Sequence, residues 1–303
     1  MLSQGPAEAS NPRTGNMRGE QEMYALILET ARNDECIRAV ILNGSRANPN
    51  APRDMFQDFD IVYLVTEVAP FVKNPKWLER FGEMMILQTP DAMFGAPPRD
   101  QFAYLMQFVD GNRIDLTLYP IAKLDAFGTD SLSVLLLDKD GIVAPFPPSN
   151  ERDYFPKPPG AQEYADCCNE FWWVSVYVAK GLWRREITYA KYMLDEIMRA
   201  ELFKMLTWQI GMETHFSKNA GKFGNYFQNY LDAQEWEMLM QTYADAEYEN
   251  NWRALFAMCA LFRQTARAVA AQFAFEYPHG DDERVTAHLE RVRASIDNEA
   301  QHD

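Results

Sequence analysis

The sequence predicts an α+β protein of two domains, in which a domain with a mixed β-sheet precedes an all-α helical bundle. Three observations predict this arrangement. Short strand-like apolar runs alternate with helical spacing up to about residue 143, six prolines interrupt the chain between Ala144 and Gly160, and only helical spacing follows. The 303 residues and the apolar fraction of 47% are sufficient for two ordinary hydrophobic cores.

The first domain, residues 17–150, is expected to contain strands interleaved with helices. The spacing first predicts a helix that begins at Glu20 and a strand from Arg38 that runs into a turn at Gly44 and Ser45. A strand over Phe59–Val65 and a helix over Trp77–Met84 follow. The last two predicted elements are strands over Gln101–Val109 and Arg113–Tyr119. Because Asp110 and Gly111 separate the last two strands, we expect them to form a hairpin. Residues 1–16 are small and polar and are predicted to be a disordered leader.

The second domain, residues 151–303, is expected to be entirely helical. Four stretches have apolar residues at helical spacing, namely Ala161–Gly181, Ile187–Gly211, Ala233–Tyr243 and Trp252–Phe275. The proline-rich stretch before them cannot form a helix or a central strand, so we place the domain boundary there.

Composition excludes several classes of protein. The chain has 29 Lys and Arg against 44 Asp and Glu, a net charge of −15, which argues against nucleic-acid binding and favours cationic small molecules. No apolar run is long enough for a transmembrane helix. The four cysteines form no C-x-x-C pair, so we expect reduced thiols in a cytoplasmic protein. We also expect the protein to be a monomer. The four histidines lack metal-ligand spacing, and any metal would be held by oxygen, which favours magnesium.

Three acidic residues carry the strongest chemical signal. Asp58 and Asp60 stand two residues apart at the start of a predicted strand, so their side chains project to the same side. Asp115 lies within another predicted strand, where an unpartnered carboxylate is costly. Gly44 and Ser45 follow a buried strand, where backbone N–H groups can bind phosphate. Such acids suit metal-dependent nucleotidyl transfer. Glycosyl transfer with a sugar nucleotide also uses D-x-D, but it does not explain the Gly-Ser turn.

The wider sequence resembles one family. The segments NGSRANPN, FQDFDIVYLVT, RIDLTL, LLLDKD and DCCNEFWWVSVYVAKGLWRREI are similar to those of the aminoglycoside 6-adenylyltransferases, the streptomycin-modifying family of the nucleotidyltransferase superfamily. The similarity extends from about Met17 to about Tyr277. It implies a nucleotidyltransferase domain and a helical substrate-binding domain that transfer AMP from ATP, with Mg²⁺, to a hydroxyl of streptomycin and thereby confer resistance. The alternative is a nucleotidyltransferase that acts on a different small-molecule or protein acceptor.

The resemblance also implies roles for individual residues, with the active site between the two domains. Asp58, Asp60 and Asp115 are the expected catalytic residues and metal ligands, while Gly44, Ser45, Arg46 and Lys180 are expected to bind the nucleotide. The helical spacing places Glu170, Trp173, Val174, Tyr177 and Gly181 on one stripe, which is either a core-facing stripe or a surface that binds the antibiotic through Glu170, Trp173 and Tyr177. Asp115 and Glu170 are both candidates for the general base.

Overall fold

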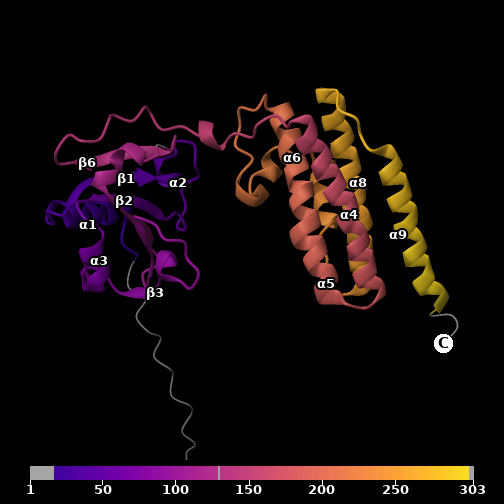
Figure 1. The fold of residues 1–303 in the computed structure, drawn as a ribbon, viewed down its shortest axis with the longest axis horizontal. Coiled ribbons are helices and arrows are strands. Elements are labelled where there is room, and N and C mark those ends of the chain that lie inside the picture. The colour runs from indigo at the N-terminus through magenta and orange to yellow at the C-terminus, as the bar shows by residue number, and fades with distance from the viewer. Residues whose placement is uncertain (1–16, 129, 300–303) are drawn as a thin grey trace, which may run out of the picture. The chain divides into compact units, whose positions relative to one another are not determined.

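The structure, a computed structural model, describes residues 17–128 and 130–299, and Figure 1 shows its fold. It divides into two compact units, one up to Asp153 and the other from Tyr154 onward. The leader predicted over residues 1–16 lies outside the described residues. A mixed sheet in the first unit and helices in the second confirm the predicted α+β class.

The first unit is built on a six-stranded sheet with the strand order β3-β4-β5-β2-β1-β6. The strands are β1 (Ile37–Asn43), β2 (Phe59–Val65), β3 (Met84–Gln88), β4 (Phe102–Phe108), β5 (Arg113–Pro120) and β6 (Ser133–Asp138). Among these described strands, β2 and β5 pair in parallel and the other neighbours pair antiparallel. The parallel pair brings the N-terminal ends of two strands that are distant in sequence to the same edge of the sheet.

Each face of the sheet has its own apolar cover. On one face, Tyr63 of β2 packs with Ile27 of helix α1 (Glu20–Arg32), and its hydroxyl donates a hydrogen bond of 2.7 Å to the Ile27 carbonyl. On the other face, Val62 packs with Leu124 and its neighbours in the segment that follows β5. The alternation of β2 side chains between the two faces therefore buries both sides of the strand.

Several local features differ from the sequence prediction. The Gly-Ser turn is the start of a short helix, α2 (Gly44–Ala47), and a further helix, α3 (Ala69–Lys73), follows β2. In place of a helix over Trp77–Met84, the chain forms a 3-10 helix over Pro75–Phe81 and then enters β3. Gly82 separates the two elements with a φ of 113°, a conformation that glycine adopts far more easily than other residues. Strands β3 and β6 were not predicted, and both lie at sheet edges.

The second unit is helical throughout its regular structure (Figure 1). Its helices are α4 (Ala161–Trp183), α5 (Ile187–Tyr192), α6 (Arg199–Glu213), α7 (Ala233–Gln241), α8 (Tyr248–Phe273) and α9 (His279–Glu299). A π-helical segment, Met193–Met198, joins α5 to α6, so the single helix predicted there is continuous but changes its winding. Within the described residues, no helix is both long enough and apolar enough to cross a membrane.

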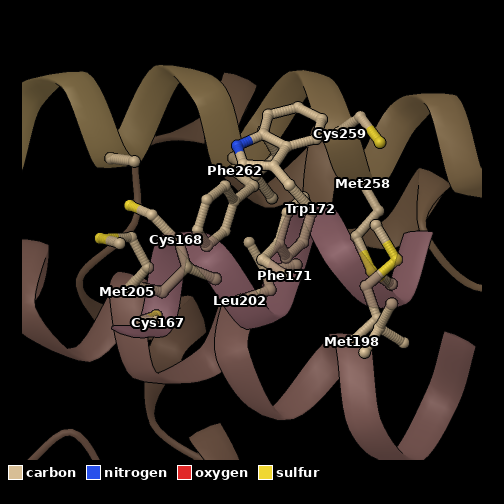
Figure 2. Close-up of a cluster of buried hydrophobic side chains, with 14 of the residues drawn as sticks. Cys167, Cys168, Phe171, Trp172, Met198, Leu202, Met205, Met258, Cys259 and Phe262 are labelled. Carbon is tan, nitrogen blue, oxygen red and sulfur yellow. The ribbon is translucent and has the colours of Figure 1, made fainter. Parts of the chain in front are cut away.

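Helices α4 and α8 share the core of this unit. Figure 2 shows Phe171 of α4 beside Phe262 of α8 in a cluster of buried side chains, and their rings stack with centroids 3.6 Å apart. Cys167, Cys168 and Cys259 are free thiols buried in the same cluster. These three cysteines form no disulfide, in agreement with the predicted reduced thiols, and they pack as small apolar side chains.

Helix α9 was not predicted, and a partly buried ion pair connects it to α8. Arg263 donates two hydrogen bonds of 2.6 Å to the carboxylate of Asp282, and the Tyr277 hydroxyl donates a third of 2.8 Å. The sequence of α9 contains few apolar residues, so its helical spacing gives little signal. This helix is held in place by a hydrogen-bonded charge pair as well as by its small apolar face.

Candidate active site

The strand register places two of the predicted acids opposite each other. Asp60 of β2 pairs with Asp115 of β5 across the parallel pair. Because strand side chains alternate, Asp60 lies on the same face of the sheet as Val62. Antiparallel pairing of β1 with β2 sets Asn43 opposite Asp60, so the chain leaves the sheet at Gly44 directly beside the acids.

Asp58 completes a cluster of three carboxylates. One oxygen from each of Asp58, Asp60 and Asp115 lies within 4.8 Å of the other two, and all three residues are partly exposed. Mg²⁺ prefers carboxylate and other oxygen ligands. The structure thus brings together the three acids that the sequence singled out, at a spacing that one divalent cation can bridge.

The electrostatics of the cluster favour a cation. Burial, and then the negative charges of Asp58 and Asp115, raise the pKa of Asp60 to about 7, while the Arg113 guanidinium lowers it. Burial is the largest cause of this rise, and the two neighbouring carboxylates add to it because Arg113 neutralises their charge only in part. A divalent cation would supply the missing positive charge.

Arg113 is the charged neighbour that the sequence analysis missed. Its Nε and Nη2 donate hydrogen bonds of 2.7 and 2.6 Å to the two oxygens of Asp115, and its Nε lies 3.9 Å from Oδ2 of Asp58. The hydrogen bond to Asp115 raises the pKa of Arg113. The signal was present in the sequence, because Arg113 precedes Asp115 by two residues and a strand places such residues on one face.

Gly44 contributes space beside Asp60. Its φ is +69°, and a Cβ at this position would overlap Oδ2 of Asp60. Its N–H donates a hydrogen bond of 3.1 Å to the Leu132 carbonyl, so this amide is engaged within the protein. The next residue, Ser45, accepts a 3.4 Å hydrogen bond at its hydroxyl from the Gln57 side chain. Hydrogen bonds therefore connect the Gly-Ser segment to the residues that precede β6 and β2.

The guanidinium of Arg46 is directed at the protein. Its Nε and Nη2 donate hydrogen bonds of 2.9 and 2.7 Å to the carbonyls of Asp58 and Gln57, and its Nη1 lies 3.5 Å from the Glu20 carboxylate. The group also lies 3.8 Å from the centre of the Phe59 ring, and only 9% of the side chain is exposed. In this position Arg46 stabilises the backbone conformation of Gln57 and Asp58.

The other predicted residues lie in the second unit, on one solvent-exposed face of α4. Trp173 is 60% exposed, and its Nε1 donates a hydrogen bond of 2.9 Å to the Tyr177 hydroxyl. The Lys180 ammonium lies 5.3 Å from the centre of the Tyr177 ring. Glu170 is also exposed, one helical turn before Trp173. These four residues, here called the α4 surface, place a carboxylate, two aromatic rings and an ammonium along one face.

The α4 surface is distinct from the core of the helical unit. Val174 and Gly181, which spacing alone grouped with Glu170 and Tyr177, are buried. Trp173 is too exposed to be a core residue. The predicted stripe therefore divides into a buried half and a solvent-facing half, and the solvent-facing half contains the residues expected to bind the antibiotic.

Comparison with known proteins gives a consistent result over almost the whole chain. The family model described as streptomycin adenylyltransferase matches residues 17–292. An aminoglycoside 6-adenylyltransferase from Bacillus subtilis (strain 168) is 44% identical over 284 residues, which is 92% of this chain and 100% of that protein. One from Campylobacter jejuni is 42% identical over 268 residues, covering 88% of this chain and 93% of that protein.

A third relative and a solved structure have similar coverage. An aminoglycoside 6-adenylyltransferase from Staphylococcus aureus is 35% identical over 267 residues, covering 87% of this chain and 95% of that protein. The crystal structure of an aminoglycoside 6-adenyltransferase from Bacillus subtilis has 42% sequence identity and a TM-score of 0.46, and covers 91% of this chain and 99% of that chain.

Proposed function

This chain belongs to the streptomycin adenylyltransferase family, and from that membership we propose that it transfers AMP from ATP to a hydroxyl group of streptomycin. Three relatives described as aminoglycoside 6-adenylyltransferases support the reaction. The structural observation that carries the proposal is the cluster of Asp58, Asp60 and Asp115 at one edge of the sheet. Modification of the antibiotic in this way would confer resistance.

Asp58, Asp60 and Asp115 are the residues that would hold Mg²⁺. Their carboxylate oxygens are the ligands that this ion prefers, and the missing side chain of Gly44 leaves Oδ2 of Asp60 accessible. When bound, Mg²⁺ neutralises negative charge on the triphosphate and on the departing pyrophosphate. The donor set thus fits the requirement of the reaction.

Of the four residues expected to bind the nucleotide, two are suited to contact its phosphates and two contribute indirectly. The Ser45 hydroxyl and the exposed Lys180 ammonium are suited to contact phosphate oxygens directly, since a compact ammonium is a good partner for a phosphate. Gly44 supplies space next to Asp60. Arg46 contributes indirectly, because its guanidinium already binds the carbonyls on either side of the Gln57–Asp58 peptide.

Glu170 is the better candidate for the general base. A base must lie within hydrogen-bond reach of the acceptor hydroxyl and have a free lone pair. Asp115 belongs to the carboxylate cluster that would hold the metal ion, which would occupy it as a ligand, whereas the Glu170 side chain is exposed and lies outside that cluster. We therefore assign metal ligation to Asp115 and proton abstraction to Glu170.

The α4 surface would bind the antibiotic through charge and aromatic faces. Streptomycin carries guanidinium groups, which pair with carboxylates in bidentate fashion and stack on aromatic rings. Glu170 provides negative charge while one of its oxygens stays available to accept the proton, and Trp173 and Tyr177 provide the rings. The ring of Tyr177 already has the Lys180 ammonium 5.3 Å from its centre, so this face accommodates a cation.

The decisive experiment is direct detection of the product. The purified protein is incubated with ATP, Mg²⁺ and each member of an aminoglycoside panel, and the mixtures are analysed by mass spectrometry. We expect streptomycin to gain the mass of one AMP and kanamycin to remain unchanged. Release of pyrophosphate without a modified aminoglycoside would assign the enzyme to a different acceptor.

A further inference from the structure

A positive side chain already lies among the three carboxylates of the first unit. The two N–H groups of Arg113 that face Asp115 occupy both of its oxygens, at 2.7 and 2.6 Å. The same guanidinium is 3.9 Å from the Asp58 carboxylate. Arg113 is thus the charge that partly balances the acidic cluster in this structure.

This arrangement competes with metal binding. Asp115 must offer an oxygen to the shared cation, but the planar fork of Arg113 uses both oxygens in a bidentate pair. A guanidinium and a divalent cation at neighbouring positions also repel each other. Competition for the Asp115 oxygens and charge repulsion therefore both favour displacement of Arg113 from Asp115 when a metal ion binds there.

The position of Arg113 allows that movement. It is the first residue of β5, and its side chain is 44% exposed, compared with 20% for Asp115. A long, flexible side chain at a strand end can turn without disturbing the sheet. A guanidinium released from a carboxylate is well suited to bind phosphate, because the same fork of N–H groups fits both anions.

We infer that Arg113 is a placeholder cation, which holds Asp58 and Asp115 in place before the nucleotide arrives and then moves from Asp115 to the triphosphate. This inference rests on the proposed nucleotidyltransferase function. It makes Arg113 a positioning residue in the free protein and a phosphate-binding residue in the complex. Removal of the Arg113 guanidinium should strengthen metal binding in the free protein and weaken nucleotide binding. The two roles can therefore be tested separately.

The first test measures Mn²⁺ binding to the full chain without nucleotide or aminoglycoside, by electron paramagnetic resonance of free Mn²⁺. Arg113→Gln removes the competing charge and fork, and we expect its affinity for Mn²⁺ to rise by about tenfold. Arg113→Lys keeps the charge but loses the bidentate fork, and we expect a smaller rise, about threefold. Unchanged or weaker binding in Arg113→Gln would overturn the inference, as would wild-type affinity in Arg113→Lys.

The second test measures nucleotide kinetics. In Arg113→Gln we expect the KM for ATP to rise at least tenfold while the KM for streptomycin changes little. An unchanged KM for ATP would remove the phosphate-binding half of the inference. Circular dichroism checks that each variant is folded, and Arg113→Lys serves in both tests if Arg113→Gln does not fold.

A matched control comes from the same sheet. Arg38 of β1 makes a similar two-pronged pair with Asp140, in which its Nε donates a 2.7 Å hydrogen bond, but it is not part of the acidic cluster. Arg38→Gln should therefore leave Mn²⁺ affinity and KM for ATP unchanged. If wild-type protein modifies no aminoglycoside, the proposed function fails, yet the comparison of Mn²⁺ affinities still decides whether Arg113 competes with the metal.

Discussion

Replacement of Asp60 by Asn should stabilise the metal-free protein at pH 8, even though it removes a proposed metal ligand. The pKa of this carboxyl rises from 3.8 to about 7 on folding, chiefly through burial and then through Asp58 and Asp115. An acid whose folded pKa is raised binds more protons in the folded state than in the unfolded state. Folding stability therefore falls as pH increases from about 4 to 7, and the loss is complete above pH 7. Asn cannot ionise, so the variant escapes this loss.

The magnitude follows from the size of the shift. One pKa unit corresponds to about 1.4 kcal/mol, so the rise to about 7 represents at most about 4 kcal/mol. The site is partly exposed, and solvent screening reduces the effect, so we expect about 2 kcal/mol at pH 8. Near pH 4 the two proteins should have similar free energies of unfolding. Mg²⁺ at 100 times its dissociation constant should then stabilise the wild type by about 2.7 kcal/mol and Asp60→Asn much less.

The measurement must report on the first unit alone, because a chain of two units need not unfold in one step. Pulse-labelling hydrogen exchange over a urea series, read at peptides from β2 and β5, gives that local free energy of unfolding. Asp110 provides a control of opposite sign. Burial raises the pKa of Asp110, but hydrogen bonds from Arg18 and Asn112 outweigh it and hold the pKa well below its usual range. Asp110→Asn should therefore lose stability at pH 8. If Asp60→Asn were also less stable than the wild type at pH 8, the electrostatic reasoning would be refuted.

Three further predictions use other parts of the structure. Gly44→Ala should reduce Mn²⁺ affinity at least tenfold in a titration, since its Cβ would overlap the Asp60 carboxylate, whereas Gly141→Ala, with a similar φ of +65° and open space, should not. Arg46→Ala should lower the free energy of unfolding of the first unit by about 2–3 kcal/mol in urea, because two carbonyls lose their donors. Trp173→Ala should change stability by less than about 1 kcal/mol but weaken streptomycin binding roughly two- to fivefold by calorimetry; equal affinities would remove Trp173 from the binding surface.

The fold and the site could be predicted best where a pattern of neighbouring residues also matches the role of those residues in the folded protein. The apolar run of β2 has the predicted bounds, Phe59–Val65, because both faces of this strand are buried. Asp110 and Gly111 correctly predict the antiparallel pair of β4 and β5. Asp58 and Asp60 could be recognised from the period of a strand alone. Each of these features depends on residues that are close in sequence.

Features that depend on distant pairing were harder to predict. The contact between Asp60 and Asp115 requires β5 to pair in parallel with β2, and no local pattern specifies that pairing. Strand β3 has Met85 and Ile86 largely exposed, so it lacks the alternation of a half-buried strand. Helix α9 is anchored by Asp282, whose partner in α8 is nineteen residues away. In these cases tertiary contacts, and not local spacing, determine the structure.

The apolar core itself determines the geometry of the acidic cluster. Ile114 and Leu116 of β5 are fully buried on the face of the sheet opposite Asp115. A shift of β5 by one residue against β2 would turn both of these side chains toward the other face and place the Asp115 carboxylate in the apolar core. The burial of two large apolar side chains and the cost of an unpaired buried carboxylate both oppose that shift. The register that brings Asp115 opposite Asp60 is therefore maintained by residues that take no part in the chemistry, and core substitutions at these positions would disturb the site as well as the stability.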